Sequence, residues 1–135
     1  MDDYKVKFEI RIDWSEIDLL GHINNLAIMK YVQAGRVHYL ELSGLMQMQT
    51  ELKKGPILAS ASCQFRKPLF YPGKVTVYSK VEGIKKTSFQ LRHLIKNDEN
   101  EIIAEALDVI VFYDFNKNSK EIIHAELRER LIDPR

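Results

Sequence analysis

The sequence has little cysteine, almost no net charge and no cluster of residues with metal-ligand spacing. Its 20 Lys and Arg nearly balance its 19 Asp and Glu, a balance that disfavours a strongly basic nucleic-acid binder. Cys63 is the only cysteine, so no disulfide can form within the chain, and we interpret Cys63 as a small packed residue on a strand. We therefore expect no disulfide framework, no metal and no cofactor.

The sequence also shows no targeting or membrane-spanning segment. Its start, MDDYKVKFEI, is charged from the second residue and lacks the apolar core of a signal peptide. No apolar run approaches the roughly 18 residues of a membrane span. A chain of 135 residues suits one compact domain. We expect a single cytoplasmic domain over residues 1–135, with neither a membrane nor a nucleic acid as partner.

Two patterns define the first third of the chain. Residues 4–13 alternate between apolar and polar side chains, which predicts a half-buried strand. Its apolar face would carry Val6, Phe8, Ile10 and Ile12. Residues 24–42 contain no proline and repeat apolar residues at three- and four-residue steps, which predicts one helix of about 18 residues. Asn24 or Asn25 would cap this helix, and Ser43-Gly44 would end it.

The remaining sequence is β-rich. Apolar segments at residues 57–69, 74–83, 87–96 and 101–115 are separated by short polar or Gly/Pro turns, which is typical of antiparallel hairpins. Residues 124–132 predict a short C-terminal helix. Residues 46–56 are read as an extension of the long helix, with a methionine-bearing lid or pocket wall as the alternative. Because the long helix is the only element able to cover the apolar face of the sheet, we predict an α+β fold in which a curved antiparallel sheet wraps this helix.

The junction between the first strand and the long helix carries an unusual set of polar residues. The stretch SEIDLLGHINN, residues 15–25, resembles the signature of hotdog-fold acyl-CoA thioesterases of the 4-hydroxybenzoyl-CoA thioesterase type. In that signature an acidic pair two residues apart is followed by glycine and often by His-x-Asn-Asn. It appears here as Glu16-Ile17-Asp18, Gly21 and His22-Ile23-Asn24-Asn25. Further matches are MKYVQAGRVHYLE, FRKPLFYPGKVTV, GIKKTSF and ELRERL, so the resemblance spans nearly the whole chain.

The resemblance implies a hotdog fold, hydrolysis of an acyl-CoA without a cofactor, and a homodimer or homotetramer with active sites at the subunit interface. By position, Asp18 matches the catalytic carboxylate, and Asn25 matches the helix-start residue whose backbone N–H polarises the thioester carbonyl. Glu16 stands where the family more usually has Asp. Asn25 stands where members acting on aromatic substrates have tyrosine, so an aromatic substrate is not implied.

The chemistry of the junction agrees with this resemblance. The first N–H groups of a helix have no intrahelical partner and carry partial positive charge, so they can stabilise an oxyanion that forms on an acyl carbonyl. Gly21 would let the chain turn and a ligand approach closely. Asp18 would either attack the thioester carbon or, if burial raises its basicity, activate water. A turn or capping role for Asp18 is the alternative.

Neighbouring residues are assigned supporting roles. His22 is interpreted as orienting or hydrogen-bonding the loop, with proton transfer as the alternative. Glu16 is interpreted as a structural acid, and Arg36 as a structural ion-pair or carbonyl-bonding residue. No Ser/His/Asp order or glycine-flanked nucleophilic serine is visible in the sequence, which disfavours a serine-hydrolase route.

Binding of coenzyme A requires cations and hydroxyl donors for its phosphates. The candidates are Arg66, Lys67, Lys85, Lys86, Thr87 and Ser88. We prefer the KKTS turn, because a turn before a strand presents side chains and N–H groups outward, although lysines at turns are often only solvated. Two other functions remain open, namely hydrolysis of acyl-acyl carrier protein and non-catalytic sensing of an acyl thioester.

Overall fold

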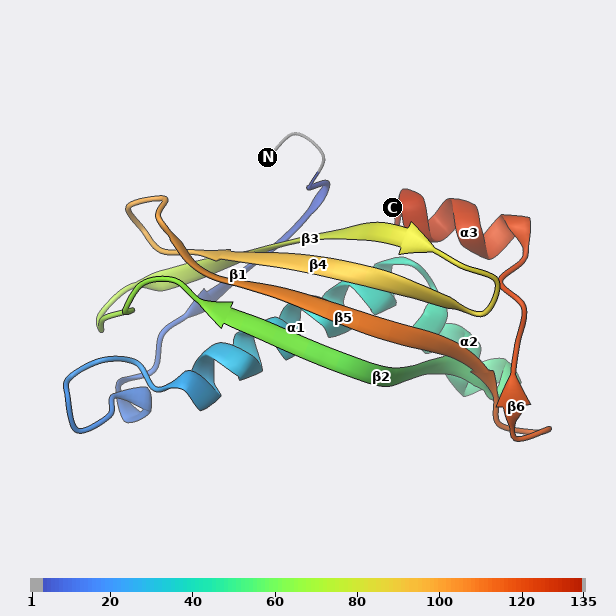
Figure 1. Cartoon of the computed structure of the whole chain (residues 1–135), viewed down its shortest axis with the longest axis horizontal. Coiled ribbons are helices and arrows are strands. Elements are labelled where there is room, and N and C mark those ends of the chain that lie inside the picture. Colours follow the sequence, from blue (N-terminus) through green and yellow to red (C-terminus); the bar gives the residue numbers. More distant parts are fainter. Residues whose placement is uncertain (1–3, 135) are drawn as a thin grey trace.

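The computed structural model describes residues 4–134 as a curved antiparallel sheet with the long helix against its inner face (Figure 1). The strands are β1 Val6–Arg11, β2 Lys54–Phe65, β3 Lys74–Ile84, β4 Ser88–Lys96, β5 Ile102–Asp114 and the short β6 Ser119–Lys120. The strand order is β1-β3-β4-β5-β2, with β6 paired to β5. β1 and β2 therefore form the two long edges of the sheet.

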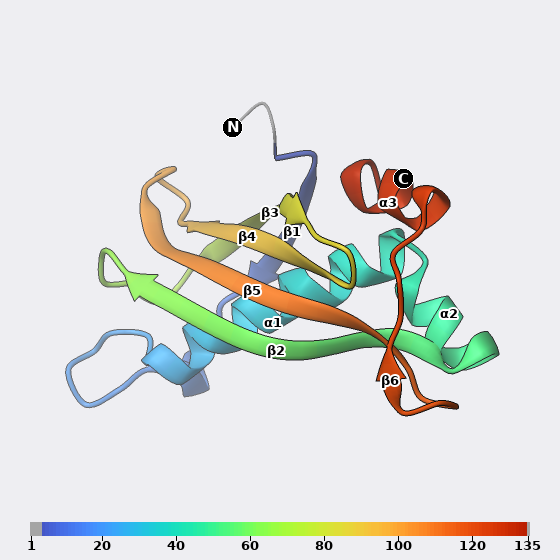
Figure 2. The same ribbon diagram turned by 45° about the vertical axis from the view of Figure 1, so that its right-hand side comes forward.

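The long helix α1 spans Asn25–Leu42, which confirms the predicted helix. Asn24 is its N-cap, and the side chain of Asn24 accepts the N–H of Ala27 at 2.8 Å. Helix and sheet approach closely at Gly35, where an added Cβ would lie 2.5 Å from Cγ1 of Val77. Figure 2 shows the sheet curving over the length of this helix. The predicted α+β fold class, a curved sheet around one long helix, is confirmed.

Residues 46–56 were predicted to extend the long helix. Part of this segment is helical, but it does not continue α1. Gly44 adopts a left-handed conformation with φ of 86°, and a separate helix α2, Leu45–Leu52, begins after it. Leu45 is fully buried. Glycine adopts this backbone conformation without steric cost, so the chain changes direction here and buries Leu45 instead of extending α1. α2 ends before Lys53, and β2 starts at Lys54.

Strand β2 lies earlier in the chain than the predicted segment 57–69. Its first residues pair with the end of β5, Lys54 with Asp114 and Pro56 with Phe112. It ends at Phe65 because the next N–H groups, those of Arg66 and Lys67, both turn to the carbonyl of Ile103. The other predicted strands agree with the structure to within two residues at each end.

The predicted C-terminal helix is confirmed as α3, Ala125–Ile132. It packs over the second half of α1, where the hydroxyl of Tyr39 donates a hydrogen bond to the carbonyl of Leu131. A core cluster joins α1, α2 and α3 through Leu40, Leu45 and Leu127, while a separate cluster lies under the first half of α1. Among residues 4–134, none of the helices has the length and apolar composition needed to span a bilayer.

Candidate active site

Glu16 ties the loop before α1 to the helix itself. Its backbone carbonyl accepts the N–H of Asn24 at 2.9 Å and the side-chain amide of Asn24 at 2.8 Å. Its carboxylate accepts the hydroxyl of Tyr31 at 2.7 Å. Burial and the hydrogen bond to Glu16 raise the pKa of Tyr31, so the phenol stays protonated. These contacts agree with the structural role predicted for Glu16.

Asp18 closes the loop with one carboxylate oxygen and leaves the other without a donor. Oδ1 accepts the N–H of Leu20 at 2.9 Å and that of His22 at 3.1 Å. The N–H of Asp18 donates in return to the carbonyl of His22 at 2.7 Å. Gly21 permits this turn with φ of 83°. Within residues 4–134, Oδ2 has no hydrogen-bond partner and the side chain is exposed. Asp18 can therefore shape the turn through Oδ1 and still offer Oδ2 to a ligand.

The first turn of α1 offers unpaired N–H groups beside this loop. The Asn24 side chain takes the N–H of Ala27, which leaves those of Asn25 and Leu26 without a protein acceptor in the described part of the chain. Asn25 is exposed, so its N–H is open to a ligand. The helix dipole adds partial positive charge at this point. The arrangement can stabilise negative charge that develops on a carbonyl oxygen.

A cleft of about 420 Å³ brings together the predicted catalytic residues other than Gly21, which lies in the adjoining turn. It contains Asp18, His22 and Asn25 from the junction and Arg66 and Lys67 from the segment after β2. The two segments are joined by a hydrogen bond of 2.8 Å from the N–H of Ile23 to the carbonyl of Leu69. Apolar side chains of Ile23, Ile28, Phe65 and Leu69 complete the lining. The cleft thus places a carboxylate, a helix start and an apolar surface side by side.

His22 contributes to the loop through its backbone. Its imidazole ring contacts the ring of Phe70 edge-on, with the centroids 5.1 Å apart. In the part of the chain that the structure describes, no hydrogen bond joins this ring to Asp18. The geometry agrees with the loop-organising role predicted for His22 and gives no support to direct proton exchange with Asp18.

The predicted coenzyme A contacts divide into two groups. Arg66 and Lys67 line the cleft, but both are engaged in ion pairs, with Glu105 at 2.8 Å and Glu101 at 2.6 Å. The remaining candidates, Lys85, Lys86, Thr87 and Ser88, form the turn between β3 and β4 at the other end of the molecule (Figure 1).

The separation between the KKTS turn and the cleft follows from strand register. Phe65 beside the cleft pairs with Ala104, which pairs with Ile95 of β4. Ser88 begins β4, so it lies about 23 Å from Ile95 at ~3.3 Å per residue. Within one protomer, the preferred KKTS turn therefore does not reach Asp18.

A buried polar network lies far from the cleft and was not predicted as a unit. Asp108 on β5 accepts bidentate hydrogen bonds from Arg36 of α1 at 2.9 and 3.1 Å and contacts Nε2 of His93 at 2.7 Å. Nδ1 of His93 contacts the hydroxyl of Ser79 at 2.7 Å. Burial raises the pKa of Asp108, but the hydrogen bonds from His93 and Arg36 outweigh it and hold the pKa below its ordinary value. The predicted ion-pair role of Arg36 is confirmed.

This network contains a serine, a histidine and an aspartate but is not a hydrolytic triad. His93 and Asp108 have no exposed surface, and Ser79 is 1% exposed, so no substrate reaches the serine hydroxyl. The imidazole also meets the serine through Nδ1 and the aspartate through Nε2, the reverse of a serine hydrolase. The sequence signal was a polar residue, Ser79, His93 or Asp108, among the alternating apolar residues of β3, β4 and β5. The network fastens α1 to the middle of the sheet.

Cys63 lies on β2, half-buried against the core under the first half of α1, which confirms its predicted packing role. Burial, followed by the charge of Asp108, raises the pKa of its thiol. Among residues 4–134, no group of His, Cys, Asp and Glu side chains is placed to hold a metal ion.

Comparison with known proteins assigns the family. The family model described as the thioesterase-like superfamily matches residues 12–131. The chain belongs to the thioesterase-like superfamily. As a member of this superfamily, it is an enzyme of thioester hydrolysis, and the predicted resemblance to a thioesterase family is confirmed.

Named relatives cover nearly the whole chain. Long-chain acyl-CoA thioesterase FadM of Escherichia coli is 23% identical over 124 residues, 91% of this chain and 94% of FadM. The chloroplastic acyl-acyl carrier protein thioesterase ATL3 of Arabidopsis thaliana is 28% identical over 127 residues, 92% of this chain and 66% of ATL3. A thioesterase of Thermus thermophilus, complexed with coenzyme A and Zn, superposes with a TM-score of 0.83 at 21% identity, covering 97% and 94% of the two chains. The last likeness shows that the fold is the hotdog fold.

Proposed function

We propose that this thioesterase hydrolyses acyl-CoA in the cleft at the start of α1. The observation that supports the proposal is the presence, in one cleft, of the donor-free Oδ2 of Asp18 and the unpaired N–H of Asn25. The thioester carbonyl oxygen would accept the Asn25 N–H, and the carbonyl carbon would face Asp18. The adjoining apolar side chains would receive the acyl chain. FadM, named as a long-chain acyl-CoA thioesterase, makes acyl-CoA the first substrate class to test.

Asp18 can act by two routes. As a nucleophile, Oδ2 bonds to the thioester carbon, the C–S bond breaks, and the CoA thiolate leaves and takes up a proton. Water then opens the mixed anhydride, which releases the carboxylic acid and restores the carboxylate. As a general base, Oδ2 instead takes a proton from the water that attacks the carbonyl directly, the C–S bond then breaks, and the CoA thiolate leaves with that proton, which restores the carboxylate. In both routes, the Asn25 N–H stabilises the oxyanion of the tetrahedral intermediate.

The proposed enzyme is a dimer joined through β2. This edge strand is exposed along most of its second half, and residues 57–65 carry neither a charged side chain nor proline. Charged side chains and proline normally protect an edge strand from pairing with another chain. Their absence from residues 57–65 favours association with a second strand. Antiparallel pairing of two β2 strands would place the Phe65 end of one copy beside the Lys54 end of the other. The same pairing would bring the KKTS turn of the partner subunit toward the cleft.

Charge introduced at this edge should produce a monomer. We expect Ser60→Lys/Ser62→Lys to prevent β2 pairing, because like charges would face one another near the twofold axis. Turnover should fall at least about 10-fold if the partner completes the site. Light scattering and thiol release measure the two effects. Gln90→Lys, on the central strand β4, is the control and should remain dimeric. A monomeric Ser60→Lys/Ser62→Lys variant with full activity would contradict the shared site.

The lysines of the KKTS turn should affect binding of the nucleotide part of coenzyme A. Lys85 and Lys86 are exposed, so Lys85→Glu/Lys86→Glu should leave the fold intact. We expect KM for acyl-CoA to rise by about 10- to 100-fold, with kcat unchanged, because charge-assisted hydrogen bonds to phosphate are lost. Acyl-pantetheine lacks the nucleotide and its phosphates, so its KM should not change.

A control variant separates a local effect from a general effect of charge. Lys117 lies in the turn before β6, and Lys120 lies in β6. Lys117→Glu/Lys120→Glu reverses the same number of charges and should leave KM unchanged for both acyl-CoA and acyl-pantetheine. An unchanged KM for acyl-CoA in Lys85→Glu/Lys86→Glu would show that the turn does not bind the substrate.

Thiol release separates the proposed function from its alternatives. The purified protein would be assayed with a panel of short, medium and long acyl-CoAs and with the same acyl groups on an acyl carrier protein. Saturable release from acyl-CoA is the expected result. Release only from the carrier protein would favour the activity for which ATL3 is named. A rise in melting temperature with acyl-CoA but no thiol release would identify a non-catalytic sensor.

A further inference from the structure

A second cavity lies between α2, α3 and the end of β5, and it takes no part in the proposed reaction. Its volume is about 490 Å³, within the range of small-molecule sites, about 300–1,000 Å³. Gly44, just beyond the C-terminal end of α1, lines it. The catalytic cleft lies at the opposite end of this helix of 18 residues, about 27 Å away at ~1.5 Å per residue. The two cavities of one protomer are therefore separate sites.

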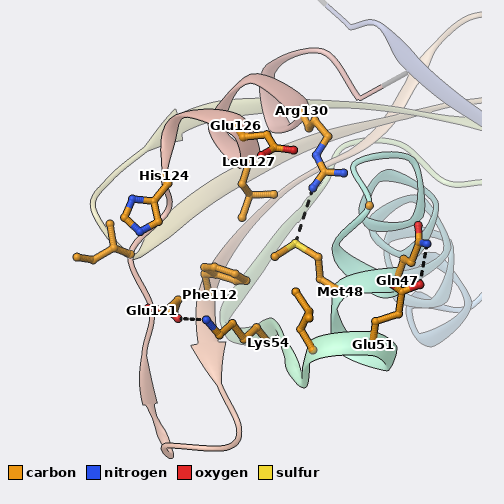
Figure 3. Close-up of a pocket in the computed structure, with 13 residues that line it drawn as sticks. Gln47, Met48, Glu51, Lys54, Phe112, Glu121, His124, Glu126, Leu127 and Arg130 are labelled. Carbon is orange, nitrogen blue, oxygen red and sulfur yellow. Dashed lines mark hydrogen bonds and ion pairs between the residues drawn. The ribbon is translucent and has the colours of Figure 1, made fainter.

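This cavity, which we name the α2–α3 pocket, has an apolar wall among polar and charged lining residues. Its apolar lining consists of Met48, Leu52, Phe112, Ile122 and Leu127. Figure 3 shows Met48 facing Phe112 and Leu127 across the pocket. Methionine adapts to ligands of irregular shape. Leu52 and Ile122 remain 54% and 41% exposed, so a ligand with an aliphatic chain would remove their apolar surface from water.

Arg130 is held at the edge of the pocket with most of its donors unused. Its guanidinium points from α3 toward Met48, and Nη2 lies 3.9 Å from the Met48 sulfur (Figure 3). The opposite side of the guanidinium lies against Gly44, where an added Cβ would be 2.7 Å from Nη1. Arg130 forms no ion pair within the described residues. A guanidinium has five N–H donors and suits a carboxylate, which it can bind through two parallel hydrogen bonds.

Among the described residues, Arg130 is the one lysine or arginine of the lining without an ion pair, and His124 also lines the pocket. Lys54 is paired with Glu121 at 2.7 Å, and Glu51 accepts the side-chain amide of Gln47 at 3.0 Å. Glu126 also lines the pocket one turn before Arg130, and its side chain extends toward Arg130 in Figure 3, although the two form no ion pair. An apolar wall beside an unpaired guanidinium is suited to a ligand that has an aliphatic tail and a single anionic head.

We propose that the α2–α3 pocket binds an aliphatic carboxylate, with the carboxylate on Arg130 and the chain against Met48, Leu52 and Phe112. This ligand is of the same chemical class as the acid that acyl-CoA hydrolysis releases. Its assignment as the reaction product rests on the proposed function, whereas the binding site itself does not. The pocket would let the enzyme respond to accumulated product at a site separate from the cleft of the same protomer.

Calorimetry with decanoate, below its micelle concentration, tests the proposal on the complete protein. We expect Arg130→Gln to weaken decanoate binding by about 10- to 100-fold, the effect of losing a charge-assisted hydrogen bond. Decan-1-ol has the same chain without the anion, and its binding should change less than about 2-fold in this variant. Lys117→Gln, a cation at the same end of the molecule outside the pocket lining, should bind decanoate as the unmodified protein does.

A second variant and a mapping experiment locate the site. Leu52→Glu alters an exposed wall of the pocket and should also abolish decanoate binding, while its melting temperature should stay close to that of the unmodified protein. Amide chemical shifts should change at Gly44, Leu52 and Leu127 on addition of decanoate, including in a catalytically inactive Asp18→Asn protein. Absence of binding, unchanged affinity in Arg130→Gln, or shifts confined to the cleft at Asp18 and Asn25 would each overturn the proposal. None of these outcomes depends on turnover.

Discussion

Replacing Asp18 by asparagine should lower kcat by about 1,000-fold or more, the range that general-base and nucleophilic groups contribute. Asparagine keeps Oδ1, so it can still accept the N–H groups of Leu20 and His22 that Asp18 binds. It removes the anionic Oδ2 that either route requires. The melting temperature should therefore remain near that of the unmodified protein while thiol release disappears. Activity and melting must be measured on the same preparation.

Two further variants separate the turn role of Asp18 from the chemical one. Asp18→Ala removes the acceptor as well as the anion, so it should lose both activity and some stability. Asp98→Asn is the matched control, because Asp98 is an aspartate outside the cleft that also accepts a backbone N–H, that of Lys74 at 3.1 Å. Asp98→Asn should retain full turnover. An active Asp18→Asn protein would mean that Asp18 serves only to shape the loop.

Replacing Asp108 by asparagine should cause the largest loss of stability, about 3–5 kcal/mol in the free energy of unfolding. The change leaves the Arg36 guanidinium in a buried setting without its bidentate anionic acceptor and weakens the contact with His93. The melting temperature should fall by roughly 10–15 °C in a domain of this size. Urea titration and thermal melting measure the change. Stability equal to that of the unmodified protein would show that Arg36 and His93 find other acceptors.

The pH dependence of stability gives this prediction a second readout. The folded state depresses the pKa of Asp108, so the unfolded chain binds the proton more readily. The stability that Asp108 contributes is fully present above its ordinary pKa of 3.8 and is lost as pH falls through the lower folded-state pKa. Asp108→Asn should remove this acidic limb. Asp114→Asn, a control in which the amide oxygen can still accept the N–H groups of Asn116 and Lys117, should lose far less stability.

Local sequence periodicity was sufficient to predict the main elements of the fold. The three- and four-residue spacing of apolar residues between residues 24 and 42 corresponds to the buried face of α1. The division of the later sequence into hairpins followed from its turn residues. The end of α1 at Ser43-Gly44 was predicted, but the separate helix α2 was not, because Ser-Gly marks the end of a helix and does not show that another one follows. The direction of α2 after Gly44 depends on the burial of Leu45 in the core, which is a tertiary contact.

The candidate site was predictable where it is local in sequence. Asp18, Gly21, His22 and Asn25 lie within one short stretch, so its motif and the unpaired helix-start N–H groups were visible without a fold. The placement of Arg66 and Lys67 in the same cleft depends on the Ile23–Leu69 contact, which no local pattern encodes. The residues of the Arg36–Asp108–His93–Ser79 network lie on α1 and three different strands. Predicting the network would therefore have required the pairing register of those strands.

A crystal structure of Asp18→Asn with a bound long-chain acyl-CoA would show where the thioester lies relative to the start of α1. The inactive protein should hold the intact thioester in the cleft. We predict the carbonyl oxygen at about 2.7–3.1 Å from the N–H of Asn25, the distance of an effective oxyanion donor, with the carbonyl carbon facing the side chain of residue 18. A thioester bound elsewhere, or a carbonyl oriented away from the start of α1, would contradict the account.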